Sequence, residues 1–138
     1  MPGAAAFPYP YSELKVYRIR PEDMQPTEVT TKGITLDIKI YTDEPGATTG
    51  VEDFRPGDEV DWSFYHDEVQ YITKGRAEIT YSLPPLHTRW HKTTAEVGCI
   101  YLIPRGARLK FKVIGNEPYR HVFVVMPGGF YPRDEFDR

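Results

Sequence analysis

The sequence predicts an all-β protein built as an antiparallel sandwich or barrel, and three observations lead to this prediction. Apolar and polar side chains alternate in residues 34–40, 77–81 and 109–113, as expected for strands with one buried face. Thirteen prolines and eleven glycines interrupt these runs at short intervals in a chain of 138 residues. Aromatic residues make up 14% of the sequence, which favours strands. We therefore expect many short strands and few long helices.

The predicted elements follow in chain order. Residues 1–13, MPGAAAFPYPYSE, contain three prolines and no sustained alternation, so we expect an N-terminal arm there. Residues 14–138 are enough for one domain with a single core. The first clear strand covers 34–40 and ends at the turn-forming residues 43–46. Further strands are expected at 77–81, 109–113 and 122–124.

The charge balance and the cysteine count argue against several classes of protein. Seventeen Lys and Arg against twenty Asp and Glu give a net charge of -3, so no basic surplus favours a nucleic-acid partner. No apolar run approaches the roughly 20 residues that span a bilayer, and no signal-peptide pattern is visible. We therefore expect a cytoplasmic protein without a membrane partner. The single cysteine, Cys99, excludes an internal disulfide and is expected to be a small core residue.

The spacing of the glycines narrows the fold. Gly57 opens a segment that reaches Glu68 and, after six more residues, Gly75, while Gly98 is followed after five residues by Pro104-x-Gly106. This frame resembles the two motifs of the cupin superfamily over roughly residues 50–127. The resemblance implies an antiparallel jelly-roll (cupin) barrel in residues 14–138, in which glycines permit tight connections between strands. A small barrel with open edges and an aromatic, proline-rich arm also predicts a homodimer.

The departures from the cupin motifs concern the metal site. The resemblance places the family's histidine ligands at positions 62, 64 and 109, which here are Trp62, Phe64 and Leu109. None of these side chains can donate a lone pair to a cation, so we expect no metal at that site and no cofactor. Residues 61–69, 103–106 and 120–127 together are most similar to the ethanolamine-utilisation protein Q type of cupin, which also lacks the histidine pair.

Acid–base chemistry is the alternative that the remaining residues offer. Glu68 keeps the family's ligand position, and His66 lies two residues before it on the same face of a regular strand. A neighbouring histidine and carboxylate can share a proton near neutral pH, so Glu68 and His66 are the candidate catalytic pair. The competing interpretation is that His66 lies at the barrel mouth and binds nothing. The other candidate ligand contacts are Gln70, Tyr65, Tyr71, Trp62, Tyr101, His121, Trp90 and Arg89.

The insertion at residues 82–97 is open to two interpretations. His87 and His91 are four apart, which is metal-ligand spacing if the segment is helical. Pro84 and Pro85 favour a loop equally, and such a loop would fold over the barrel mouth as a lid or extend as a solvated hairpin.

The sequence as a whole predicts a small-molecule enzyme, an isomerase, lyase or cyclase, that acts by acid–base chemistry on a neutral or aromatic compound. Two alternatives stay open. One is a non-catalytic cupin that binds a small ligand. The other is a metal-dependent oxygenase or lyase with a site rebuilt from His66, Glu68 and His121, with His87 or His91 as further ligands.

Overall fold

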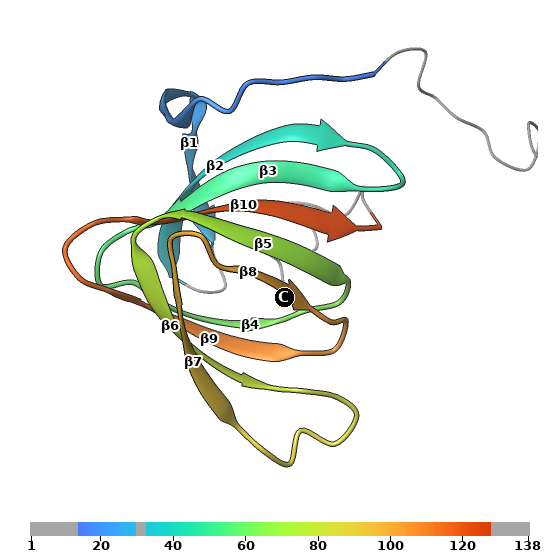
Figure 1. Cartoon of the computed structure of the whole chain (residues 1–138), viewed down its shortest axis with the longest axis vertical. Helices are drawn as coiled ribbons and strands as arrows, with labels where there is room; N and C mark the ends of the chain where they lie inside the picture. Colours follow the sequence, from blue (N-terminus) through green and yellow to red (C-terminus); the bar gives the residue numbers. More distant parts are fainter. Residues whose placement is uncertain (1–13, 30–32, 128–138) are drawn as a thin grey trace, which may run out of the picture.

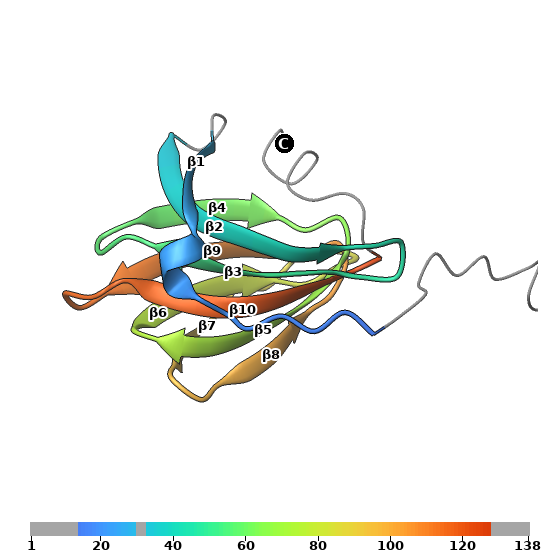
Figure 2. The ribbon, with the colours of Figure 1, turned by 90° about the horizontal axis from the view of Figure 1, so that it is seen from above.

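Two antiparallel sheets make up the computed structural model, which describes residues 14–29 and 33–127 (Figure 1). Six strands follow the order β1-β2-β3-β10-β5-β8 in one sheet, and four follow the order β4-β9-β6-β7 in the other. The two sheets lie face to face (Figure 2). The elements are η1 (Pro21–Asp23, a 3-10 turn), β1 (Gln25–Val29), β2 (Ile34–Asp43), β3 (Thr48–Phe54), β4 (Glu59–Ser63), β5 (Asp67–Lys74), β6 (Arg76–Ser82), β7 (His91–Glu96), β8 (Ile100–Ile103), β9 (Arg108–Ile114) and β10 (Tyr119–Met126).

The prediction of an all-β antiparallel jelly-roll is confirmed. The three stretches of alternation seen in the sequence fall within β2, β6 and β9, and the strand expected at 122–124 falls within β10. In β10, buried and partly buried residues alternate along the whole strand, and β9 shows the same period of two. This alternation turns one side chain in two toward the space between the sheets.

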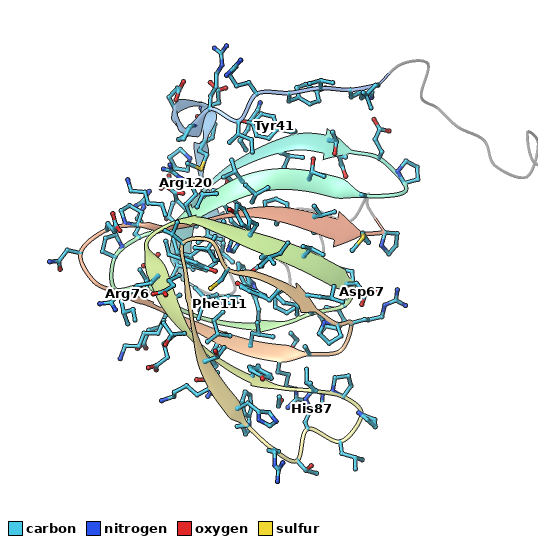
Figure 3. All side chains as sticks on the ribbon, in the orientation of Figure 1. Tyr41, Asp67, Arg76, His87, Phe111 and Arg120 are labelled. Carbon is cyan, nitrogen blue, oxygen red and sulfur yellow. The ribbon has the colours of Figure 1, made fainter. Side chains whose placement is uncertain are left out.

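Aromatic side chains fill much of the space between the sheets. Phe54 is at the centre, with ring centroids of Trp62, Phe111 and Tyr119 each 5.6 Å away. Figure 3 shows Phe111 among these interior side chains. Trp62, a candidate ligand contact in the sequence, is thus packed in this core and is 5% exposed. Burial of such rings is the main stabilising term for a small barrel.

One glycine of the cupin frame is required by close packing of the backbone. Gly75 has φ +70° in the tight turn between β5 and β6. A Cβ added there would lie 2.2 Å from the carbonyl oxygen of Pro118, in the turn that precedes β10. Only glycine fits both the left-handed backbone and this contact.

Residues 14–20 run in an extended conformation beside β2 without joining a sheet (Figure 1). The backbone N–H of Arg20 donates to the hydroxyl of Tyr41 at 2.9 Å, and the ring of Tyr17 packs against the ring of Tyr41. The predicted arm at residues 1–13 lies outside the described residues. No helix in the described part of the chain is long and apolar enough to cross a membrane.

Candidate functional site

A hollow of about 510 Å³ opens between the edge strands of the two sheets, β7 and β8. Its walls are largely apolar and come from β6, β7, β8 and β9. Leu109, at the position of a cupin metal ligand, is one of the lining residues. The polar groups on the walls include Thr93 and Thr94 at the rim and Tyr101 on β8. Tyr101 is the residue that joins this hollow to the polar interior of the barrel.

Five polar side chains form a hydrogen-bonded row behind the hollow, which we call the Glu68 network. Its members in order are Tyr119, Tyr101, Gln70, Glu68 and His66. The two tyrosine hydroxyl oxygens are 2.8 Å apart, and Tyr101 donates to the side-chain carbonyl of Gln70. Gln70 Nε2 donates to Glu68 Oε2 at 2.5 Å, and His66 Nε2 lies 3.2 Å from Glu68 Oε1.

The alternation of β5 directs this network inward. Glu68, Gln70 and Ile72 are buried, whereas Tyr71 between them is exposed. Gln70 also pairs with Tyr101 across β5 and β8, which places the phenol beside the amide. The register of two neighbouring strands therefore builds the network from residues that are far apart in the sequence.

The hydrogen bonds of the network point toward Glu68. Tyr101 uses its single hydrogen on Gln70, so the hydroxyl of Tyr119 donates to Tyr101. The same direction continues at Gln70, because its side-chain carbonyl accepts from Tyr101 and its amide nitrogen donates to Glu68. A carboxylate only accepts, so His66 presents Nε2–H to its other oxygen. Glu68 is the acceptor at which the network ends.

The two tyrosines stay protonated over a wide pH range. Burial raises the pKa of Tyr101 well above its usual value of 10, and the neighbouring Tyr119 raises it further. Burial likewise raises the pKa of Tyr119 far above its ordinary range. Loss of water disfavours the charged phenolate, so both groups act as neutral donors at physiological pH.

A second histidine–carboxylate pair lies next to the Glu68 network. His121 on β10 and Glu52 on β3 are direct cross-strand partners, and Nε2 of His121 donates to Glu52 Oε1 at 2.6 Å. One ligand-type atom from each of Glu52, Glu68 and His121 lies within 4.8 Å of the others. Sequence reasoning missed Glu52. The signal that could have found it is its spacing with Gly50 and Phe54, which places it on the inward face of β3.

The residues present do not fit the metal site of the cupin family. Trp62, Phe64 and Leu109 are buried and offer no lone pair. The group of Glu52, Glu68 and His121 is also a poor cage as it stands. A tetrahedral ion bonded to Glu52 and His121 at roughly 2.0–2.2 Å would hold those two atoms more than about 3 Å apart, beyond their present contact.

The remaining candidates lie away from the Glu68 network. Tyr65 and Tyr71 are 53% and 44% exposed. Trp90 in the 83–90 loop packs its ring against the ammonium group of Lys110, and Arg89 beside it is exposed. Loop residue His87 is held by Ser82, whose Oγ lies 2.7 Å from Nδ1, and Figure 3 shows it far from Phe111. His91 stacks on Tyr81.

The insertion at residues 82–97 is therefore a loop followed by strand β7, with no helix that would set His87 and His91 on one face. It contributes Leu83 and the β7 residues 93–95 to the hollow. The insertion therefore forms part of the wall at the rim of the hollow. The contacts of His87 and Trp90 hold its loop in place.

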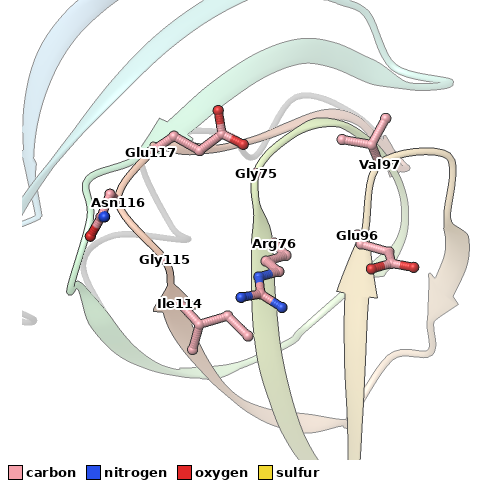
Figure 4. Close-up of a pocket in the computed structure, with 8 residues that line it drawn as sticks. All are labelled: Gly75, Arg76, Glu96, Val97, Ile114, Gly115, Asn116 and Glu117. Carbon is pink, nitrogen blue, oxygen red and sulfur yellow. The ribbon is translucent and has the colours of Figure 1, made fainter.

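A second hollow, of about 550 Å³, lies at the end of the barrel that carries the β5–β6 and β9–β10 turns (Figure 4). Arg76, Glu96 and Glu117 line it, and all three are exposed. Exposed charges are screened by water and salt, so this hollow offers weak recognition compared with the buried network.

Comparison with known proteins identifies the family. The sequence model of the ethanolamine utilisation protein EutQ matches residues 14–131. The chain belongs to the EutQ family. The sequence-based resemblance to this type of cupin is thereby confirmed. No curated protein sequence matches the chain.

Solved structures with this fold include an EutQ protein. The EutQ protein of Clostridium difficile is 18% identical, with 80% of this chain and 81% of that chain covered and a TM-score of 0.56. The cupin domain of Cnp3 from Schizosaccharomyces pombe is 21% identical over 67% of this chain and 61% of that chain, with a TM-score of 0.57. A variant of oxalate decarboxylase from Bacillus subtilis is 15% identical over 91% of this chain and 33% of that chain, with a TM-score of 0.66. At these identities the likeness shows a shared fold.

Proposed function

We propose that this EutQ-family protein is a small-molecule enzyme that moves protons, as an isomerase, lyase or cyclase does, with Glu68 and His66 as its acid–base pair. The observation that carries the proposal is the Glu68 network, five hydrogen-bonded polar side chains inside an aromatic barrel and next to a hollow. Enzymes of this kind commonly place buried titratable groups beside a pocket.

The energetic cost of the network supports a functional role. Glu68 and His66 are each 3% exposed, and Gln70 is fully buried. Taking a carboxylate and its partners out of water costs free energy that well-packed apolar residues of similar size would not. A barrel that needed only a stable core has no reason to retain these groups.

The hollow suits a small apolar or aromatic ligand. A volume of about 510 Å³ is within the range of small-molecule sites, and its walls are largely apolar. Tyr101 lines it, whereas Glu68 lies behind Gln70. In the proposed reaction the ring of Tyr101 turns away from Gln70 and admits the ligand to Glu68. Side-chain gating of this kind is common in enzymes.

The proton steps follow from the polarity of the network. Glu68 accepts a proton from the ligand, and the electron pair of the broken bond stays on the ligand. Glu68 then returns that proton to another atom of the ligand, and His66, which donates Nε2–H to Glu68 Oε1, stabilises the carboxylate that is restored. Oxalate decarboxylase shares the fold, which supports enzyme chemistry in such a barrel only by analogy.

The second candidate function is a binding protein without turnover. The observation that favours it is the position of Glu68, which does not line the hollow. Such a protein would hold its ligand against Tyr101 and leave Glu68 as a buried support.

A ligand screen tests whether the hollow binds a small molecule and whether the protein converts that molecule. Compounds that raise the melting temperature of the wild-type protein are assayed again with Thr93→Trp, which fills the rim of the hollow, and with Thr73→Trp, an exposed change on β5 away from it. We expect hits that persist in Thr73→Trp, disappear in Thr93→Trp and are converted to product. Hits that survive Thr93→Trp contradict the site, and hits that bind there without conversion contradict the enzyme.

We also propose a homodimer, formed through the β8 edge of the six-stranded sheet. Ile100 and Leu102 on β8 are 67% and 60% exposed, and Tyr71 on β5 adds to the same outward face. An apolar edge strand of this kind pairs readily with a second copy. The cytoplasmic location stays a prediction from the sequence.

A further inference from the structure

His121 carries a polar atom without a hydrogen-bond partner among the described residues. Its ring is fully buried, and Nδ1 is the unpartnered atom. Phe54, Tyr119 and Phe123 surround the ring, with centroids 5.6, 5.2 and 6.4 Å away. Buried polar atoms without a partner are uncommon in folded proteins and call for a reason, which is often a catalytic one.

The bond to Glu52 decides the form of the ring. The carboxylate of Glu52 only accepts, so Nε2 of His121 carries a hydrogen and donates it at 2.6 Å. A second hydrogen on Nδ1 would make the ring a charged donor among aromatic rings, with no acceptor in the described part of the chain. The neutral ring with hydrogen on Nε2 avoids that cost. Nδ1 is then a bare lone pair inside the barrel.

We infer that His121 is a proton acceptor of this barrel and that Glu52 is the positioning residue that holds it ready. The arrangement is that of a base whose far nitrogen is fixed by a carboxylate. The sequence offers His121 as a ligand contact or a ligand of a rebuilt metal site, and the role of Glu52 depends on the pairing of β3 with β10. This inference rests on the proposed acid–base function and adds a second acid–base pair to it.

Access to His121 is shared with Glu68. The ligand-type atoms of His121 and Glu68 lie within 4.8 Å of each other. In the inferred reaction, a ligand that passes Tyr101 to reach Glu68 also contacts Nδ1 of the His121 ring. The fitting ligand class is an apolar or aromatic molecule with one hydroxyl or activated C–H group. Nδ1 takes its proton, the electron pair stays on the ligand, and the imidazolium is balanced by Glu52 until the proton returns to the ligand.

The wild-type protein, labelled with ¹⁵N-histidine, tests the inference directly by NMR. We expect the His121 signals to show hydrogen on Nε2 and a bare Nδ1 at neutral pH. Glu52→Met removes the acceptor, so the ring should lose this single tautomer. Glu52→Gln offers a carbonyl to the same hydrogen and should restore it. Glu28→Met, the same change at an exposed glutamate of β1, is the matched control and should alter nothing. Hydrogen on Nδ1 in the wild-type protein overturns the inference, as does a tautomer that Glu52→Met leaves unchanged.

Phenol and benzene test whether Nδ1 of His121 accepts a hydrogen from a ligand, because the two compounds differ by one hydroxyl. Phenol should move the Nδ1 signal and benzene should not. In His121→Gln, which can still donate to Glu52, phenol affinity should fall about 3–10-fold with benzene affinity unchanged. Equal effects of the two compounds on Nδ1, or no effect of phenol, contradict the inference. Either result would contradict the role of His121 and leave that of Glu68 untouched, because the role of Glu68 is measured separately by the turnover of Glu68→Gln.

Discussion

Tyr101 on β8 donates its hydroxyl hydrogen to the side-chain carbonyl of Gln70 on β5, its direct cross-strand neighbour. This contact connects the apolar hollow at the sheet edges to the carboxylate of Glu68 in the barrel interior. A single hydroxyl thus lies at the boundary between the surface where a ligand arrives and the groups that would act on it.

Removing that hydroxyl should weaken the fold measurably. Tyr101→Phe leaves the carbonyl of Gln70 without its donor and Tyr119 without its acceptor. We expect a loss of about 1–3 kcal/mol in the free energy of unfolding, measured by urea denaturation. Tyr71→Phe is the control, because Tyr71 is 44% exposed and should cost almost nothing. Equal stability of the two variants would show that the network does not form.

The same tyrosines should make the protein sensitive to alkali. Burial raises the pKa of Tyr101 and of Tyr119, whereas both titrate near 10 in the unfolded chain. The unfolded state therefore releases protons that the folded state keeps, and stability falls as pH rises above about 10. Each group contributes a slope of up to about 1.4 kcal/mol per pH unit. Urea denaturation between pH 9 and roughly 11.5 should show a smaller slope in Tyr101→Phe, and an unchanged slope would exclude this cause.

Two glycine substitutions test the glycine spacing that predicted the cupin fold. Gly75→Ala brings a Cβ to 2.2 Å from the backbone of Pro118, whereas Gly57 has φ +84° with nothing within 4 Å. We expect Gly57→Ala to cost about 1–2 kcal/mol for the left-handed backbone alone. Gly75→Ala should cost more than about 3 kcal/mol or prevent folding. Thermal melts of both proteins compare them, and equal melting temperatures would mean that the Pro118 contact is not required.

The proposed dimer has its own test. Sedimentation velocity should show a dimer of the wild-type protein at micromolar concentration, and Leu102→Lys should convert it to a monomer with the same circular dichroism spectrum. A charge on an edge strand blocks pairing with another sheet. Leu86→Lys changes an equally apolar residue that is 75% exposed in the 83–90 loop and should stay dimeric. A monomeric wild-type protein would remove the dimer from the account.

The fold could be predicted from sequence because its signals are local. Alternation in residues 34–40 and 109–113 needs only neighbouring positions, and the glycine of the β5–β6 turn stands out by itself. The inward direction of Glu68 and Gln70 follows from the same period of two. These features depend only on short stretches of sequence, because the period of two of a strand decides which side chains face inward.

The connections within the site could not be predicted, since they depend on strand register. Glu52 and His121 are 69 residues apart and meet because β3 pairs with β10. The hydrogen bond from Tyr101 to Gln70 likewise depends on the pairing of β5 with β8. The position of Trp90 over Lys110 depends on how a proline-rich loop folds back, for which the sequence holds no periodic signal.

The proposed function requires Glu68 to exchange a proton with a ligand inside the barrel. Its most direct test is the turnover of Glu68→Gln relative to the wild-type protein, on a substrate found by the ligand screen. Glutamine keeps the size of the side chain and its hydrogen-bonding capacity but has no ionisable carboxyl. We predict a loss of about 10²–10⁴-fold in turnover with the circular dichroism spectrum unchanged. Full turnover in Glu68→Gln would contradict the account.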